Sequence, residues 1–530
     1  MFNNIKMSLS DIVGENYVDA VCLGKSALTG ENAEELKGTA LEKVDFFPES
    51  FESRQDFLAD FVGDIIAPPY ENGMEGAPTA SFKAAQNNAA SPLGGFGCYR
   101  LGEDGRLYFA AKSEHYHIPL GHFFPGYALI EKAKKIGIPN ATHNNTRGYI
   151  TRLLEQRLIS EANGIDWGDA GELERILHKN EPGLLNRVIN LETGSLAAEA
   201  AVKMMLSRFY AIDGGPAVHS GRIPVFLVMA DNGGGKTANY HGTTVIAQTL
   251  RGLWPEFAEK IESADIYRVV PVRINDAEDF KAKVEEYNTG RFKIAGFCHE
   301  IILMNYGGIR LDESYLQSAY ELCRRHDIPV LCDEIQSCAW YGKLFLFREY
   351  GLKPDFVAVG KGFPGGNYPA SKILCSSRLD SLNQFGALVT NGQEELASLA
   401  YLITMEFVKA NEKQISEMGR YYFESVRRLT VLFPDMVTAV EGDSHMAAIC
   451  FKSAEKVLEF CRQMNQRFCM DVSSQAYKPH CPPAVLTKLP VISTIKIIDR
   501  VVKRMEECLE SISGEASASN QNQRLSAAGN

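Results

Sequence analysis

Five short apolar runs separated by helical patterns are the feature that most constrains the fold of this chain. The runs are Val225–Met229, Val269–Val272, Ile294–Phe297, Val330–Cys332 and Phe356–Val359. Continuous apolar runs of this length are typical of strands buried on both faces, as in parallel sheets. Between two of them, apolar residues recur at helical spacing from Leu316 to Cys323, which indicates a crossover helix. The sequence therefore predicts an α/β fold with a mostly parallel central sheet flanked by helices.

Length and charge narrow the class of protein. With 530 residues, 45% of them hydrophobic, the chain is expected to have more than one domain and a large core. The net charge of −11 argues against a nucleic-acid partner, because phosphate binding requires clustered Lys and Arg. The sequence shows neither a membrane-spanning apolar segment nor a secretory signal. We therefore expect a cytoplasmic protein that acts on small molecules.

The chain divides into five expected regions. Residues 1–95 form an accessory N-terminal region, and residues 96–165 form the N-terminal part of a smaller α+β domain. Residues 166–400 form the large domain that contains the sheet, and residues 401–513 the C-terminal part of the small domain. Residues 514–530 are small and polar, and we expect a disordered tail.

Three features that suggest other chemistry have ordinary explanations. The twelve cysteines are scattered without CxxC pairs, so buried free thiols explain them better than disulfides. His115 and His117 could share one face of a strand, but no further ligands lie near them in the sequence, so no metal is expected. The run NGGGKT ends like a phosphate-binding P-loop, but Ala230 stands where the motif needs its first glycine. A surface loop is expected there.

Two residues that follow neighbouring predicted strands indicate a cofactor. Asp333 ends the run IPVLCD, and Lys361 follows the next run in DFVAVGKGFPGG. Ligands of such sheets lie beyond the carboxyl ends of the strands. A lysine between Gly360 and Gly362 has little steric cover, so its amine can reach a carbonyl group. A carboxylate beside a pyridine nitrogen keeps that nitrogen protonated, which makes the ring an electron sink. The pair predicts pyridoxal 5′-phosphate.

A third segment is suited to the phosphate of such a cofactor. Thr193, Gly194 and Ser195 precede an alanine-rich helix, so backbone N–H groups and a hydroxyl converge on a helix N-terminus. A simple Ser or Thr cap without a ligand is the alternative. Tyr240 lies in a loop after the first predicted strand, where it could stack on a planar ring or fill the core.

These motifs, in this order, resemble those of the class III aminotransferases, a branch of the fold-type I pyridoxal-phosphate enzymes. The matching elements are PLGHFFP, RVINLETGSLAAEAAVK, Tyr240-His241-Gly242, FCHEIILMNYGG, and the stretch from VLCDEIQSC through GKGFPGG. The resemblance runs from about Gly105 to Ile512. It implies that Lys361 carries the cofactor as a Schiff base, that Asp333 pairs with its ring nitrogen, and that Gln336 bonds its phenolic oxygen. Tyr240 would stack on the ring.

Further roles follow from the same resemblance. Gly194 and Ser195 would bind the phosphate. Thr390 matches a family Thr that reaches the phosphate from the neighbouring subunit, which implies a homodimer. Glu300 would tune the substrate pocket, and Lys488 stands where many members place an Arg for the substrate carboxylate. An ammonium lacks the bidentate fork of a guanidinium, so carboxylate recognition is expected to be weaker or to come from elsewhere.

The sequence also departs from the family pattern. After Gln336 it runs Ser-Cys-Ala-Trp-Tyr-Gly, about one residue shorter than the family's Thr-Gly-Phe-Gly-Arg-Thr-Gly and without its arginine. Glu394 and Glu395 replace the family's Asn-Pro. Leu196 and Ala198 replace a Glu and an Asn of the phosphate passage, but backbone donors there do not depend on those side chains.

The resemblance implies a transaminase that passes an amino group from an amino acid or amine, by family habit a terminal amine, to a 2-oxo acid. The expected kinetics are ping-pong, through a Lys361 aldimine. An aminomutase, racemase or decarboxylase needs the same lysine and protonated ring. A homologue that binds the cofactor without turnover is the alternative from another class. Stoichiometric amino transfer to an added 2-oxo acid distinguishes the transaminase.

Overall fold

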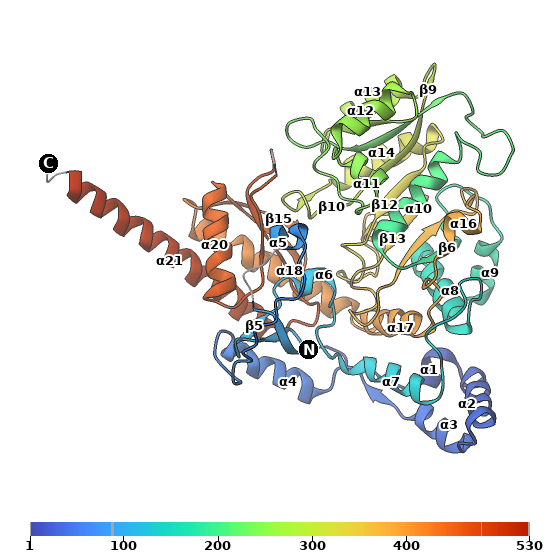
Figure 1. Ribbon diagram of the computed structural model, residues 1–530, viewed down its shortest axis with the longest axis horizontal. Coiled ribbons are helices and arrows are strands. Elements are labelled where there is room, and N and C mark those ends of the chain that lie inside the picture. The colour runs from blue at the N-terminus through green and yellow to red at the C-terminus, as the bar shows by residue number, and fades with distance from the viewer. Residues whose placement is uncertain (1, 86–89, 479, 528–530) are drawn as a thin grey trace.

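A seven-stranded sheet forms the centre of the computed structural model, which describes residues 2–85, 90–478 and 480–527 (Figure 1). In spatial order its strands are β6 (Arg187–Leu191), β14 (Ser371–Cys375), β13 (Phe356–Val359), β12 (Val330–Asp333), β9 (Phe292–His299), β7 (Ile223–Met229) and β8 (Arg268–Val272). The five predicted strands are β7, β8, β9, β12 and β13, and all five run parallel. β14 runs antiparallel to both of its neighbours, β13 and β6, and thus opposite to the other six strands. The predicted α/β architecture is confirmed.

Helices cover both faces of this sheet because successive side chains of each strand point to opposite sides. Alternate residues of β13 belong to two different apolar clusters. α10 (Gly194–Leu206) packs on one face, and α13 (Ala277–Tyr287) and α14 (Glu313–Arg325) pack on the other. α14 is the predicted crossover helix, and the apolar residues that suggested it are buried. Further helices of this part are α8 (Tyr149–Asn163), α9 (Ala170–Leu177), α11 (Val245–Leu250), α12 (Pro255–Ser263), α15 (Leu346–Glu349), α16 (Gln384–Ala387) and α17 (Glu395–Ala410).

Two smaller sheets lie beside the large one. The first is antiparallel, in the order β15 (Val437–Asp443), β16 (Met446–Phe451), β18 (Ala484–Lys488), β17 (Ser473–Gln475). It packs against α18 (Glu412–Arg427) and α20 (Ala454–Gln466), and α21 (Ile495–Ala527) packs against these two helices. The second contains β3 (Pro92–Phe96), β4 (Tyr99–Gly102) and β5 (Leu107–Phe109). Phe109 N donates to Cys469 O at 2.9 Å. The segment after residue 95 therefore contacts the C-terminal part of the chain.

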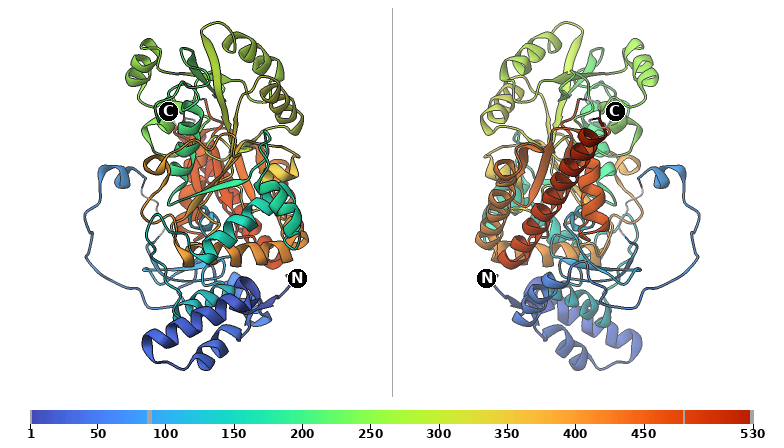
Figure 2. Two further views of the ribbon diagram at one scale, coloured as in Figure 1. Left: turned by 90° about the vertical axis from the view of Figure 1, so that its right-hand side faces the viewer. Right: turned by 90° about the vertical axis from the view of Figure 1, so that its left-hand side faces the viewer.

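The N-terminal region packs onto the main body. It contains α1 (Leu9–Val13), α2 (Glu15–Thr29), α3 (Ala33–Leu41) and α4 (Glu49–Leu58). The rings of Phe2 and Phe47 lie 6.3 and 5.9 Å from that of Phe407 in α17. Both belong to the apolar cluster that also includes residues of the central sheet. A loop carrying α5 (Ala80–Ala85) stands away from the body (Figure 2).

Two predicted boundaries do not coincide with the packing. α8 contacts β6 and α17, although residues up to 165 were expected in the small domain. α21 continues to Ala527 and extends away from the body in Figure 1, whereas composition predicts a disordered tail from residue 514. Extending a helix that has already formed costs less free energy than starting a new one. The alanine and glutamate residues of the tail are compatible with this extension.

The prediction that the cysteines are buried free thiols is confirmed. All twelve cysteines are free thiols, and all are buried. Within the described part of the chain, no helix is long and apolar enough to cross a membrane.

Glu395, one of the two residues that depart from the family's Asn-Pro, caps a helix from another segment. Gly148 precedes α8 and has no side chain with which to cap it. The Glu395 carboxylate accepts hydrogen bonds from Ile150 N at 2.9 Å, Thr151 N at 3.1 Å and the Thr151 hydroxyl at 2.6 Å. A Cβ at position 148 would lie 2.2 Å from Glu395 Cδ. The carboxylate therefore satisfies the free N–H groups at the start of α8.

Replacing this carboxylate is expected to destabilise the protein. Glu395→Ala leaves buried N–H groups without an acceptor, so the free energy of unfolding should fall by about 1–3 kcal/mol. Glu394→Ala is the control, because the neighbouring side chain caps no helix and should change stability by less than about 0.5 kcal/mol. Urea unfolding measures both. Equal stability of the two variants would contradict the cap.

Candidate functional site

The carboxyl ends of β12 and β13 bring the predicted residues into one cavity. The strands are neighbours, with Asp333 paired to Ala358, so Asp333 and Lys361 leave the sheet at the same edge. The cavity there has a volume of about 480 Å³. Its lining includes seven of the nine residues singled out from the sequence: Gly194, Ser195, Tyr240, Glu300, Asp333, Gln336 and Lys361.

Lys361 has an unusual backbone conformation. Its φ is 47°, a left-handed value that is strained for a residue with a Cβ and that clusters at active sites. Its glycine neighbours are required by close packing rather than by the access expected from the sequence. A Cβ would lie 2.1 Å from Ser371 Oγ at Gly360 and 2.3 Å from the Trp340 ring at Gly362. Burial lowers the pKa of Lys361, while Glu300 and Asp333 raise it.

Asp333 is held by two partners. Its Oδ2 accepts a hydrogen bond from His241 Nδ1 at 2.9 Å, and its Oδ1 accepts one from Ile335 N at 3.1 Å. Both Asp333 and His241 are buried. The two hydrogen bonds therefore hold the carboxylate in a fixed orientation at the cavity.

Glu300 and Gln336 are hydrogen-bonded to each other. Gln336 Nε2 donates to Glu300 Oε1 at 2.6 Å. Burial, and next the neighbouring Asp333, raise the pKa of Glu300 well above its usual range. Both effects favour the protonated form of the Glu300 carboxyl group.

The segment predicted to cradle the phosphate lies at the start of α10. Thr193 is the N-cap residue, and its hydroxyl accepts from Leu196 N at 3.4 Å. Ser195 Oγ accepts from Thr243 N at 3.0 Å. Gly242 has φ 112°, and a Cβ there would lie 2.6 Å from Ser195. Helix N–H groups and hydroxyls thus line one end of the cavity, an arrangement suited to an anion.

Tyr240 lies beside this cradle, half-buried. The Arg251 guanidinium lies 5.1 Å from the centroid of its ring. This cation–π contact steadies the ring.

Two predicted residues lie outside the cavity lining. Thr390 is exposed. Lys488 is fully buried, and its Nζ donates to the backbone carbonyl of Gln336. Its amine is therefore turned away from the cavity in which a substrate carboxylate was expected.

Several lining residues were missed from the sequence. His241 was noted only as part of a motif, since no local signal pairs it with a carboxylate 92 positions away. Glu192 directly precedes the phosphate passage, and its position beside Thr193 could have indicated it. His117, which the sequence suggested only as a metal ligand, and Gly366, the last residue of the matched stretch, also line the cavity. The segment from Asn367 to Ser371 lines it as well, and no sequence pattern marks that segment.

The alternative sites are absent from the part of the chain that the structure describes. No group of three potential metal ligands occurs there, and His115 lies in a left-handed turn rather than in a strand. In the NGGGKT loop the Asp231 carboxylate accepts from Gly233 N at 3.0 Å, Gly235 N at 2.8 Å and Thr237 N at 3.1 Å. A carboxylate therefore occupies the amides that would bind a phosphate.

The residues fit pyridoxal phosphate. Among the described residues, the buried atoms His241 Nε2, Glu300 Oε2 and Gln336 Oε1 have no hydrogen-bond partner, although such atoms are normally satisfied. Glu300 and Gln336 face the cavity together with Lys361. Helix N–H groups, the Asp333 carboxylate and the Lys361 amine thus surround a space that can take a planar, phosphorylated ring.

Comparison with known proteins agrees with this geometry. The sequence model of class III aminotransferases matches residues 95–474. The ornithine aminotransferase of Schizosaccharomyces pombe is 26% identical over 414 residues, which cover 75% of this chain and 85% of the relative. The acetylornithine aminotransferase of Clostridium acetobutylicum is 28% identical over 271 residues, or 50% and 63% of the two chains.

The fold is also found in solved structures. The crystal structure of the ornithine aminotransferase from Toxoplasma gondii superposes with a TM-score of 0.64 at 17% identity, and covers 84% of this chain and 97% of its own. At that identity the likeness concerns the fold, and the family match extends over most of the chain. This chain therefore belongs to the class III aminotransferases and is an enzyme that uses pyridoxal 5′-phosphate.

Proposed function

We propose that this aminotransferase takes the amino group from a terminal amine of its donor and passes it to a 2-oxo acid. The observation that carries the proposal is the shared cavity of Lys361 and the His241-bound Asp333. Two relatives are named ornithine and acetylornithine aminotransferase, and a structural neighbour from Plasmodium falciparum is named ornithine delta-aminotransferase. These names support an amine distant from the α-carbon as the reacting group.

Lys361 and Asp333 carry the chemistry in this proposal. Pyridoxal phosphate, when bound, supplies an electron-accepting ring that stabilises a carbanion. Lys361 Nζ would hold the cofactor covalently and, as a free amine, would move a proton to and from the reacting carbon. Its lowered pKa favours the neutral amine that this transfer requires. Asp333 keeps the ring nitrogen protonated, and His241 fixes the carboxylate.

The remaining cavity residues bind and orient. Gly194 and Ser195 lie where the helix N-terminus favours a phosphate. Tyr240 would stack on the ring, and Gln336 would form a hydrogen bond with the phenolic oxygen. The donor and the 2-oxo acid occupy the same cavity in turn, which gives ping-pong kinetics.

A homodimer completes the site in this proposal. Thr390 is exposed rather than in its own cavity, which supports a contact with the phosphate held by a second copy. The cytoplasmic location expected from the sequence stays a prediction.

Amino transfer can be followed through the visible absorbance of the cofactor. Donors added one at a time should bleach the band of the wild-type holoenzyme, and a 2-oxo acid should restore it stoichiometrically. Lys361→Ala should lack the band, because the covalent bond is lost. Lys372→Ala is a control that removes another buried lysine. Bleaching without restoration by any 2-oxo acid argues against a transaminase, and a normal band in Lys361→Ala contradicts the assignment of Lys361.

The Asp333 carboxylate should be needed for turnover but not for attachment of the cofactor. Asp333→Asn keeps the shape and removes the charge that faces the ring nitrogen, so we expect kcat to fall by roughly 10²–10³-fold. His241→Ala should also lower kcat, by a smaller factor. Rate measurements at saturating donor, with absorbance as the control for attachment, test this. Unchanged kcat in Asp333→Asn would refute the role.

The raised pKa of Glu300 predicts that the stability of the folded protein depends on pH. Its folded pKa is raised, so its contribution to stability is present at low pH and is lost as pH rises toward the folded value. Glu300→Gln does not titrate. Relative to wild type, the variant should therefore be more stable at pH 8 than at pH 5, in urea unfolding without added cofactor. The same stability difference at both pH values would contradict a raised pKa.

A further inference from the structure

Lys488 is the last residue of β18, and its side chain is completely buried. Its Nζ donates to the carbonyl oxygen of Gln336. It also lies 3.5 Å from the centroid of the Trp340 ring and 4.5 Å from that of Tyr116. A buried amine is costly unless such groups compensate it. The contacts thus define a specific site for this amine.

One of these three partners lines the cavity, and the other two lie close to Lys361 or to its neighbour Gly362. Gln336 lines the cavity. Trp340 packs so closely on Gly362, the residue after Lys361, that a Cβ there would lie 2.3 Å from the indole. The Tyr116 ring lies 5.0 Å from Lys361 Nζ. Lys488 therefore joins the loop that contains Gln336 and Trp340 to the turn that contains Tyr116, close to Lys361.

The backbone around Lys488 fixes one of these segments further. Lys488 N donates to Ala111 O at 2.8 Å, and Lys488 O accepts from Ser113 Oγ at 2.5 Å. The turn that follows, Ser113 to Tyr116, has four consecutive φ values between 47° and 72°. A left-handed turn is strained for residues that have a Cβ, so it persists only where the surrounding structure holds it.

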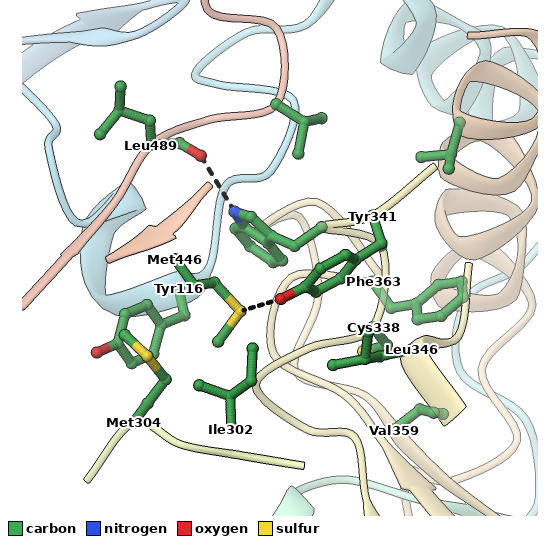
Figure 3. Close-up of a cluster of buried hydrophobic side chains, with 14 of the residues drawn as sticks. Tyr116, Ile302, Met304, Cys338, Tyr341, Leu346, Val359, Phe363, Met446 and Leu489 are labelled. Atoms are coloured by element: carbon green, nitrogen blue, oxygen red, sulfur yellow. Dashed lines mark hydrogen bonds between the residues drawn. The ribbon is translucent and has the colours of Figure 1, made fainter. Parts of the chain in front are cut away.

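Trp340 is fixed in the same way. Its Nε1 donates to Leu489 O at 3.1 Å (Figure 3). Trp340 lies in the shortened loop that lacks the family's arginine, and Lys488 stands where many members have another arginine. The side chains at these two departures from the family pattern, Trp340 and Lys488, contact each other. The two replacements therefore belong to one contact and are not independent losses of an arginine.

We propose that Lys488 is a positioning residue that clamps Gln336, Trp340 and Tyr116 behind Lys361 and does not bind a substrate carboxylate. This rests on the proposed function of Lys361. Among the described residues that line the cavity, Lys361 is the only Lys or Arg, so within this chain the cavity offers a substrate carboxylate no second cation. The clamp orients the Lys361 amine for proton transfer.

The test compares the holoenzyme with Lys488→Met, which keeps the length of the side chain and removes the amine. The donors are 1,4-diaminobutane and 4-aminobutyrate, which are similar in length and differ in one carboxylate. The readouts are the saturating rate of bleaching, the half-saturating donor concentration, and the visible circular dichroism of the bound cofactor. Lys293→Met is the control, since this buried lysine bonds His326 O away from the cavity.

A clamp predicts that Lys488→Met lowers the saturating rate by the same factor for both donors, roughly 10- to 100-fold, and alters the circular dichroism. Lys293→Met should change neither. Trp340→Phe should shift both readouts in the same direction, and it carries the test if Lys488→Met does not fold. A higher half-saturating concentration for 4-aminobutyrate alone, or no change in any readout, overturns the proposal. If neither donor bleaches the wild type, the proposed donor class fails, while the circular dichroism still tests the clamp.

Discussion

The parallel pairing of β12 with β13 is the constraint on which the site depends. It places Asp333 opposite Ala358, so that Asp333 and Lys361 emerge at the same edge of the sheet. A shift by one residue would turn Asp333 to the other face. Because the cavity is buried, each charge there acts strongly on its neighbours. Burial lowers the pKa of Lys361, and the two nearby carboxyl groups raise it again.

The sequence was sufficient to predict features encoded by adjacent residues. Five buried strands and the crossover helix α14 follow from continuous or periodic apolar residues, and Phe356–Val359 has the bounds expected. β6 and β14 did not appear in that prediction, because β6 begins with Arg187 and β14 includes Lys372, which interrupt an apolar run. The residues at the strand ends were also predictable, since the edge of a parallel sheet determines where ligands lie.

Features that depend on distant partners could not be predicted. His241 and Asp333 are separated by 92 positions, and only the fold brings them together. The departures from the family pattern show the same limit. In the sequence, Glu395 and Lys488 appear only as replacements of family residues. In the structure, Glu395 caps α8, and Lys488 contacts Trp340 and Gln336. Each replacing side chain is therefore bound by buried groups elsewhere in the chain.

The central claim is that Lys361, and no other buried lysine near the cavity, holds the cofactor. Borohydride reduction of the holoenzyme, followed by proteolysis and mass spectrometry, tests this directly, because reduction makes the bond between lysine and cofactor permanent. The account predicts a phosphopyridoxyl group on the peptide that contains Lys361. The same group on Lys112 or Lys488, with Lys361 unmodified, would contradict it.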